Sequence, residues 1–431
     1  MNNKIHKTSF GGWKNCFSLR NAGVEMIATA DIGPRIIFLG FEGETNLLKL
    51  FEGQVGRSGD DSFLFYGGHR LWAAPEDPQL SYIPDNEAIE AVLLEEEGIL
   101  ILIRKADESN LEKRLSMRVA TIAERKMLVE DSGEVEVSEN STKDNIKEDK
   151  LMRVATLGQG HVVSEDSGVG ERLQLSHENN VETDKLMRVV KMDKGKDVER
   201  EGGQDDDPKS FARPGLEEQL SEPPSMNDES SKHHFQNNKD CDSGVMASFV
   251  VRNELINRGQ SPITTASWGI TSLTPGGTGF MPFDKEISPQ KQLQARNQIN
   301  LWDYTSLANP AYQWKDEWLE IDQSRTKSKQ KVGSFNRKAW LAYRLEDLVL
   351  VIFVPQLQSE EENYPDLRSN IEIYFDEDML ELETLSAWET INPGESVYHD
   401  EVWALIKLND DPDNETVIRD YVYPLVHGQI K

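Results

Sequence analysis

The chain of 431 residues carries 47 Lys and Arg against 76 Asp and Glu, which gives a formal net charge of −29 at pH 7. This charge repels nucleic acid and anionic lipid, so neither is expected as a partner. The N-terminal residues contain no apolar run of signal-peptide length, and no segment approaches the roughly 20 apolar residues of a membrane span, so a cytoplasmic protein is predicted.

Residues 10–104 consist of short apolar runs separated by turn residues. The runs are VEMIATADIGPRIIFLGFEG, DSFLFYGG and AIEAVLLEEEGILILIRK, and each is typical of β-strands. Glu97-Gly98 separates two β-rich runs at the spacing of a hairpin. An antiparallel meander is therefore expected.

The next region contains no aromatic residue between Lys105 and Ser210 and carries an internal repeat. A Met-Arg-Val core recurs with a period of 35 residues, at Met117, Met152 and Met187. A solenoid would need more large apolar side chains, so a tandem duplication of one strand and its loop is favoured, with the first copy in the sheet. We predict that residues 122–244 form an acidic, largely disordered insertion, and that residues 1–121 and 245–431 form one discontinuous domain.

Strand patterns resume after the insertion. ASFVVRNELINRG alternates as a strand, and ITTASWGITSLTPGGTGFMPF predicts two strands around its Pro-Gly-Gly turn. KAWLAYRLEDLVLVIFVPQ predicts a hairpin across Glu346-Asp347, and NIEIYFDEDMLELETLSAW and SVYHDEVWALIKL predict further strands. No segment has a long helical period, so the predicted class is all-β, a large antiparallel β-sandwich.

Four of these segments resemble a bacterial family, the DUF4380 proteins, which is similar to the galactose-mutarotase-like superfamily. They are FYGGHRLWAAPEDP (65–78), NRGQSPITTASWGITSLTPGG (257–277), YPDLRSNIEIY (364–374) and LELETLSAWETINPGESVYHDEVW (380–403). The resemblance implies a supersandwich that binds a sugar or sugar derivative in an open cleft.

The resemblance to aldose 1-epimerases also implies a catalytic pair. In those enzymes a His acts as general acid toward the ring oxygen and a Glu as general base on the anomeric hydroxyl. Glu383 precedes a Pro-Gly-Glu turn, as the epimerase base does, and His69 follows a Gly-Gly pair, with the order of His and glycines reversed. We therefore expect His69 as acid and Glu383 as base, facing each other across one hollow.

Five further residues are predicted to bind the sugar, because cations, aromatic rings and carboxylates suit its hydroxyls and its C–H faces. They are Arg70, Trp72, Trp268, Asn370 and Glu372. The second epimerase His is replaced here by Asn257-Arg258, so a non-catalytic carbohydrate-binding protein stays open beside an epimerase. No cofactor or metal is expected, since Glu76 and Asp77 are better explained as a solvent-facing loop.

Overall fold

The computed structural model describes residues 5–121, 245–285, 293, 295–355, 357, 359 and 361–426. The predicted insertion, with Met152 and Met187, lies outside these residues. The described strands all pair antiparallel and form two sheets, which confirms the all-β sandwich. No helix within the described ranges is long and apolar enough to cross a membrane.

The larger sheet has 11 strands. In spatial order they are β1 (His6–Phe10), β2 (Trp13–Asn21), β3 (Val24–Thr29), β4 (Arg35–Phe41), β5 (His69–Ala74), β10 (Ile263–Leu273), β19 (Leu380–Leu385), β18 (Ile371–Phe375), β15 (Gln330–Ser334) and β12 (Asn300–Leu301), with β20 (Glu389–Ile391) paired to β10.

The second sheet has 10 strands. In spatial order they are β13 (Tyr312–Trp314), β14 (Trp318–Asp322), β11 (Thr278–Pro282), β16 (Trp340–Leu345), β17 (Leu348–Phe353), β21 (Ser396–Lys407), β9 (Val245–Asn257), β8 (Leu111–Val119), β7 (Ile99–Arg104) and β6 (Glu90–Leu94). The short helical segments are η1 (Glu52–Gln54), η2 (Gln323–Arg325), η3 (Glu361–Asn363), α3 (Pro365–Arg368), α4 (Asn414–Thr416), η4 (Val417–Val422) and α5 (Tyr423–Val426).

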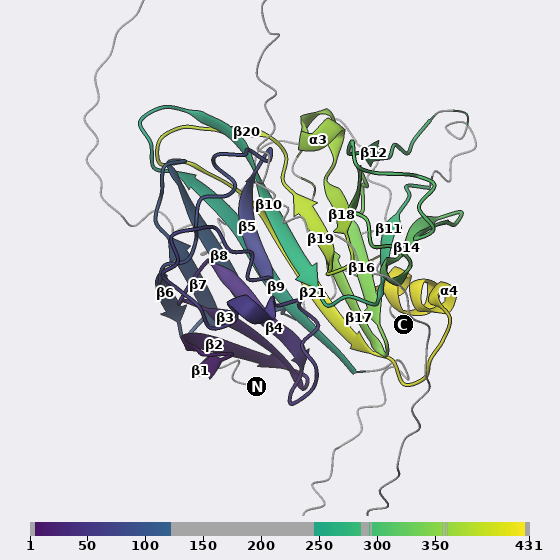
Figure 1. Ribbon diagram of the computed structural model, residues 1–431, viewed down its shortest axis with the longest axis horizontal. Helices are drawn as coiled ribbons and strands as arrows, with labels where there is room; N and C mark the ends of the chain where they lie inside the picture. Colours follow the sequence, from purple (N-terminus) through teal and green to yellow (C-terminus); the bar gives the residue numbers. More distant parts are fainter. Residues whose placement is uncertain are drawn as a thin grey trace, which may run out of the picture. The chain divides into compact units, whose positions relative to one another are not determined.

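Strands from the two ends of the sequence meet within both sheets. In the larger sheet, β5 pairs with β10, and in the second sheet, β8 pairs with β9 (Figure 1). The first repeat copy supplies β8, where Met117 is 1% exposed. The expectation that this copy occupies the strand next to β7 is confirmed.

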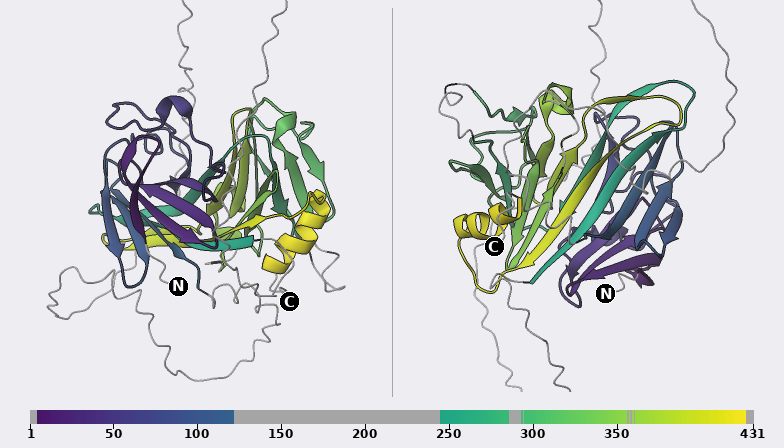
Figure 2. Two further views of the ribbon diagram at one scale, coloured as in Figure 1. Left: turned by 90° about the horizontal axis from the view of Figure 1, so that it is seen from below. Right: turned by 180° about the vertical axis from the view of Figure 1, so that it is seen from behind.

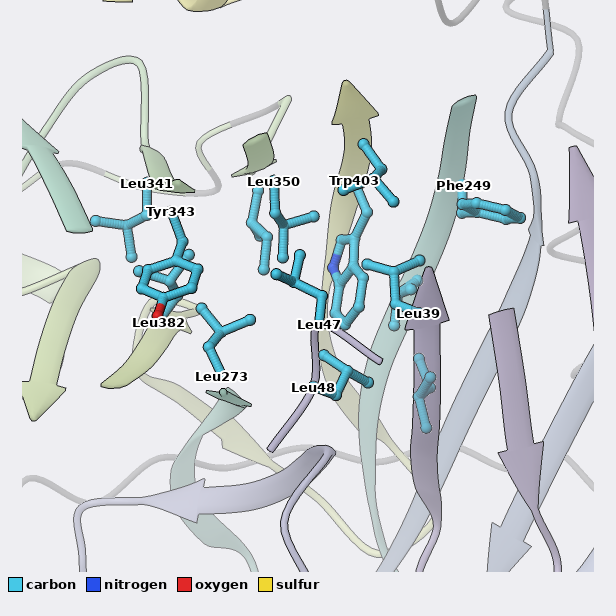
Figure 3. Close-up of a cluster of buried hydrophobic side chains, with 14 of the residues drawn as sticks. Leu39, Leu47, Leu48, Phe249, Leu273, Leu341, Tyr343, Leu350, Leu382 and Trp403 are labelled. Carbon is cyan, nitrogen blue, oxygen red and sulfur yellow. The ribbon is translucent and has the colours of Figure 1, made fainter. Parts of the chain in front are cut away.

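Apolar side chains from both sheets fill the space between them. Leu273 and Leu382 from the larger sheet lie in one cluster with Leu350 and Trp403 from the second (Figure 3). Complete burial of one such side chain stabilises the fold by about 1.5–3 kcal/mol. This shared core fixes which face of each strand points inward.

The outer faces of the two sheets are covered differently. The C-terminal helical segment, yellow in Figure 2, packs on the second sheet, where Val417 and Ile418 join a cluster with Trp318 and Trp340. The outer face of the larger sheet instead carries a polar cluster, bordered by Phe63 and other side chains of connecting segments.

The hairpins predicted at Glu97-Gly98 and Glu346-Asp347 are present as β6–β7 and β16–β17. The strand predicted in DSFLFYGG is wrong, because β4 pairs directly with β5 and leaves this run no place in the sheet. Its alternating aromatic residues serve another purpose: Phe63 packs against Trp72, and Phe65 packs against Phe63.

Candidate functional site

The predicted acid and base, His69 and Glu383, lie on opposite faces of the larger sheet. His69 is opposite Thr271 of β10, whereas Glu383 is opposite the preceding residue, Ile270. Because side chains alternate between the two faces of a strand, His69 points between the sheets and Glu383 points away from them. The register therefore contradicts the prediction that they flank one sugar ring.

His69 belongs to a polar group that we name the intersheet cluster: His69, Asn253, Thr384, His399 and Glu401. Its members are at most 1% exposed. His69 Nε2 lies 3.0 Å from Asn253 Oδ1, and His399 Nε2 lies 2.9 Å from the hydroxyl of Thr384. Glu401 accepts a hydrogen bond from that hydroxyl and has an oxygen 3.8 Å from each imidazole.

The intersheet cluster is satisfied from within the protein. Trp403 Nε1 donates to Glu401 at 2.8 Å. Burial raises the pKa of Glu401, but His69, His399 and the Thr384 hydroxyl outweigh it and lower this pKa to about 2. Burial lowers the pKa of His69. With every polar group paired and closed to solvent, the cluster joins the two sheets and offers no place for a substrate.

The opposite face of the same sheet carries a second group, which we name the outer-face cluster. It consists of Arg70 and Trp72 from β5, Trp268 from β10, Glu381 and Glu383 from β19, Glu372 from β18, Lys331 from β15, and Trp302 from the segment after β12. These strands are neighbours in the order β5–β10–β19–β18–β15, so strands from distant parts of the sequence meet here; β5, β10, β19 and β18 are labelled in Figure 1.

Lys331 links two glutamates that are direct cross-strand partners. Its Nζ lies 2.7 Å from Glu372 Oε2 and 2.8 Å from Glu383 Oε2. Trp268 Nε1 donates to the same oxygen of Glu383 at 2.8 Å. The three charged side chains are between 0% and 6% exposed, so removal of the Lys331 charge would leave two buried carboxylates unpaired.

A second ion pair lies next to the first. Arg70 Nη1 donates to Glu381 Oε1 at 2.8 Å, and the Ser272 hydroxyl donates to the same oxygen at 2.6 Å. Since Glu381 and Glu383 are two residues apart on β19, their side chains share the outer face.

Indole rings lie under both cations. Lys331 Nζ is 4.7 Å from the ring centre of Trp268 and 4.6 Å from that of Trp302, and Arg70 Cζ is 4.8 Å from that of Trp72. A glycine on β15 leaves space beside one ring, because a Cβ at Gly333 would lie 2.5 Å from Ser369 Oγ and 3.2 Å from Trp302 Cη2.

The pKa values of the carboxyl groups in the outer-face cluster are shifted in opposite directions. Burial raises the pKa of Glu372 well above its ordinary value, and the charges of Glu383 and Asp366 raise it further. Burial likewise raises the pKa of Glu383, although Lys331 opposes this. For Glu381 the effect of burial is outweighed by Arg70, and the pKa is lowered. Acidic groups of different proton affinity therefore stand side by side.

Several hydrogen-bonding atoms of the cluster remain without partners among the described residues. Glu372 Oε1 and Arg70 Nε are buried and have none. The internal bonds of Glu381 and Glu383 each use a single carboxylate oxygen. Unused acceptors and a donor beside indole rings are what a polyhydroxylated ligand with apolar faces requires.

A turn with unusual backbone geometry brings another carboxyl group to the cluster. In α3, Asp366, Leu367 and Arg368 have φ values of 48°, 57° and 74° although none is glycine. Asn300 Nδ2 donates to the carbonyl groups of Asp366 and Leu367 at 3.0 and 2.9 Å and holds this turn. Burial raises the pKa of the Asp366 carboxyl, and its charge is one of those that raise the pKa of Glu372.

The structure brings together Arg70, Trp72, Trp268, Glu372 and Glu383 of the predicted site residues. Asn370 is not available, because its amide accepts from the backbone N–H of Asn336 and donates to the carbonyl of the same residue, both at 2.9 Å. Its role is to fix the start of β18.

Sequence reasoning did not assign Lys331, Asp366 or Trp302 to the site. Lys331 lies in a short polar strand, and its partners on β18 and β19 follow it by about 40 and 50 residues in the sequence. One signal was present: Glu381 and Glu383 alternate with Leu380 and Leu382 in β19, which places both carboxylates on one face.

No protein-family model matches the chain, and no curated protein matches it in sequence. Several solved structures are similar in fold. The Slr1438 protein from Synechocystis sp. PCC 6803 matches with a TM-score of 0.42 and 8% identity, over 93% of this chain and 99% of that one. A galactose mutarotase-like protein from Lactobacillus casei has a TM-score of 0.42 and 6% identity, over 91% and 100%.

A galactose mutarotase related enzyme from Lactobacillus acidophilus matches with a TM-score of 0.36 and 6% identity, over 92% of this chain and 99% of that chain. At TM-scores below 0.5 these similarities give no information about function.

Proposed function

We propose that this chain is a carbohydrate-binding protein of the galactose-mutarotase-like superfamily and that the sugar binds at the outer-face cluster. The observation that carries the proposal is a set of carboxylate oxygens for which the described chain supplies no hydrogen-bond donor, beside three tryptophan rings on one sheet face. Sugar hydroxyls donate to carboxylates, while the C–H faces of the ring pack on indoles.

The proposal is binding rather than catalysis by a histidine and a glutamate. Among the described residues, His69 and His399 lie in the intersheet cluster, on the far side of the larger sheet from Glu383. Neither of these two imidazoles is therefore available to protonate the ring oxygen of a sugar held by Glu383.

Access to the cluster is supported by two exposed tyrosines at its border. Tyr82 is 38% exposed, and its ring centre lies 5.3 Å from that of Trp72. Tyr304 is 46% exposed; partial burial raises the pKa of its hydroxyl to about 12, while the charge of Lys331 lowers it and that of Glu383 raises it. Both rings extend the aromatic lining toward solvent.

Titration calorimetry against a panel of neutral monosaccharides and oligosaccharides tests the proposal. Glu383→Gln keeps the shape of the side chain but removes its charge, so we expect roughly ten-fold weaker binding. Glu44→Gln is a matched control, because Glu44 pairs with Lys407 at 2.6 Å on the exposed surface. Absence of binding to every sugar, or equal affinity in the wild type and Glu383→Gln, would refute the site.

A further inference from the structure

One lysine on the inner face of the second sheet has no counter-charge. Lys113 of β8 is 9% exposed, and its ammonium group forms no hydrogen bond or ion pair with the part of the chain that the structure describes. Buried lysines in folded proteins are almost always paired, because an ammonium group that has lost its water needs other partners. Lys113 therefore points to a site outside the outer-face cluster.

The strand register places a second cation beside this lysine. Arg104 of β7 is the direct cross-strand partner of Lys113, so their Cβ atoms are about 4.5–5.5 Å apart. The next pair in the same register, Leu102 and Leu115, lies in the core between the sheets. Because side chains alternate between the two faces of a strand, Arg104 and Lys113 also point inward.

Two acidic side chains are near these cations, but each is already paired with an arginine. Arg104 Nη2 donates to Asp107 Oδ2 at 3.2 Å and to the carbonyl of Pro84 at 2.8 Å, which brings the next residue, Asp85, to the same place. Asp85 Oδ2 accepts a hydrogen bond from Arg35 Nη2 at 2.7 Å. Neither carboxylate forms an ion pair with the lysine.

We name Arg35, Asp85, Arg104, Asp107 and Lys113 the rim cluster. It contains three cations and two carboxylates, so one positive charge is not neutralised within it. Arg104 Nε is buried and has no acceptor in the described chain. The side chains of Asp85, Arg104 and Asp107 are 13–14% exposed, so the cluster is in contact with solvent.

The electrostatic balance at Lys113 agrees with this count. Burial lowers the pKa of Lys113, and the charges of Arg104 and Arg35 lower it further, while Asp85 and Asp107 oppose the shift. The two acids therefore do not replace what the ammonium group has lost by burial. A further negative charge beside Lys113 would stabilise its charged form.

We propose that the rim cluster binds a small monocarboxylate, whose oxygens accept hydrogen bonds from Lys113 Nζ and Arg104 Nε. A single negative charge completes the charge balance of the cluster. The two oxygens of a carboxylate match two donors that lie side by side on neighbouring strands. A phosphate group would bring more negative charge than the cluster lacks.

Thermal unfolding of the full chain at pH 7 tests the proposal, with sodium formate, acetate or glycolate replacing sodium chloride at constant ionic strength. For at least one carboxylate, the midpoint should rise by roughly 2–4 °C for each ten-fold increase in concentration once the site is mostly occupied. Salts also act on stability through the whole protein surface, so the quantity compared is the difference between the wild type and a variant.

Lys113→Met and Lys113→Gln are the informative variants. Both remove a buried charge that has no partner, so each should fold, and each should lose the carboxylate-dependent rise of the midpoint. Lys105→Met is the matched control, because Lys105 is exposed and follows Arg104 directly in the sequence; this variant should keep the full rise.

Three results would overturn the inference. The first is the same midpoint in every carboxylate as in chloride. The second is an equal carboxylate effect in the wild type and both Lys113 variants. The third is a sulfate effect that depends on Lys113 as strongly as the carboxylate effect does, which would contradict the assignment to a singly charged ligand. None of these results bears on the carbohydrate site, which lies on the other face of the larger sheet.

Discussion

A single glycine makes room for the intersheet cluster. A Cβ at Gly269 would lie 2.6 Å from Glu401 Oε1 and 2.9 Å from Asn253 Nδ2. Both atoms belong to packed, hydrogen-bonded side chains, so neither can move freely. The space left by this glycine is therefore what allows the buried carboxylate and its partners to lie between the sheets.

We expect Gly269→Ala to lower the free energy of unfolding by about 1–3 kcal/mol, the usual cost of overpacking an interior. Gly53→Ala is the control, since no atom lies within 4 Å of its added Cβ and its φ is not positive. Urea unfolding of the two variants measures the difference. Equal stability would mean that the cluster can rearrange around a methyl group.

The buried imidazole of His69 predicts a pH dependence. Because burial lowers the pKa of His69 in the folded protein, the unfolded chain binds the proton first as the pH falls below the ordinary value of 6.5. The stability that depends on neutral His69 is present above pH 6.5 and is lost below it.

The free energy of unfolding, measured from unfolding curves at pH 7.5, 6.5 and 5.5, should therefore decrease more steeply with acidification in the wild type than in His69→Gln. The comparison between the two proteins cancels the contributions of other titrating groups. One of these is Glu372, whose raised pKa affects the stability with the opposite sign. Parallel pH profiles would show that His69 takes up its proton without disturbing the fold.

At the scale of the element, β8 has one place for a Met-Arg-Val copy, and Met117 fills it. Met117→Ala should lower the stability by about 2–5 kcal/mol, because it leaves a cavity between β7 and β9. Met152→Ala and Met187→Ala repeat the change in nearly the same local sequence and should leave the stability within about 0.5 kcal/mol. Thermal or urea unfolding of the three variants is the measurement.

The strands could be predicted where local chemistry decides them. Turn residues at Glu97-Gly98 and Glu346-Asp347 located two hairpins, but DSFLFYGG has the same alternation and forms no strand. Whether an alternating segment pairs depends on the neighbours that the sheet order gives it. That order is set by contacts between distant segments, which a local pattern does not contain.

The candidate site shows the same division. The motif around Arg70 and Trp72 correctly indicated that β5 contributes to the site. The sheet face on which the adjacent His69 lies depends on the register of β5 against β10, and a shift of one residue would reverse it. Lys331 could not be predicted at all, because its role follows from the position of β15 beside β18. The residue types indicated which chemistry to expect, and the sheet topology decided which residues lie in the same site.

For the molecule as a whole, we predict that the two sheets form without the chain between β8 and β9. The two strands are neighbours, and Ala120 N donates to the carbonyl of Ser248 at 3.1 Å where the chain leaves and re-enters the sheet. Deletion of residues 128–243 should therefore leave a soluble protein with one cooperative thermal transition, followed by circular dichroism. A broad, non-cooperative melt would show that the removed residues support the sandwich.

The left-handed turn of α3 has a consequence for attempts to make this protein more robust. Each residue there that is not glycine costs roughly 1–2 kcal/mol, and Leu367 recovers little of this by burial, since most of its surface faces water. A laboratory selection for heat resistance alone would favour glycine at this place. The most heat-resistant variants from such a selection would then be those in which the backbone of α3 no longer fixes the position of Asp366.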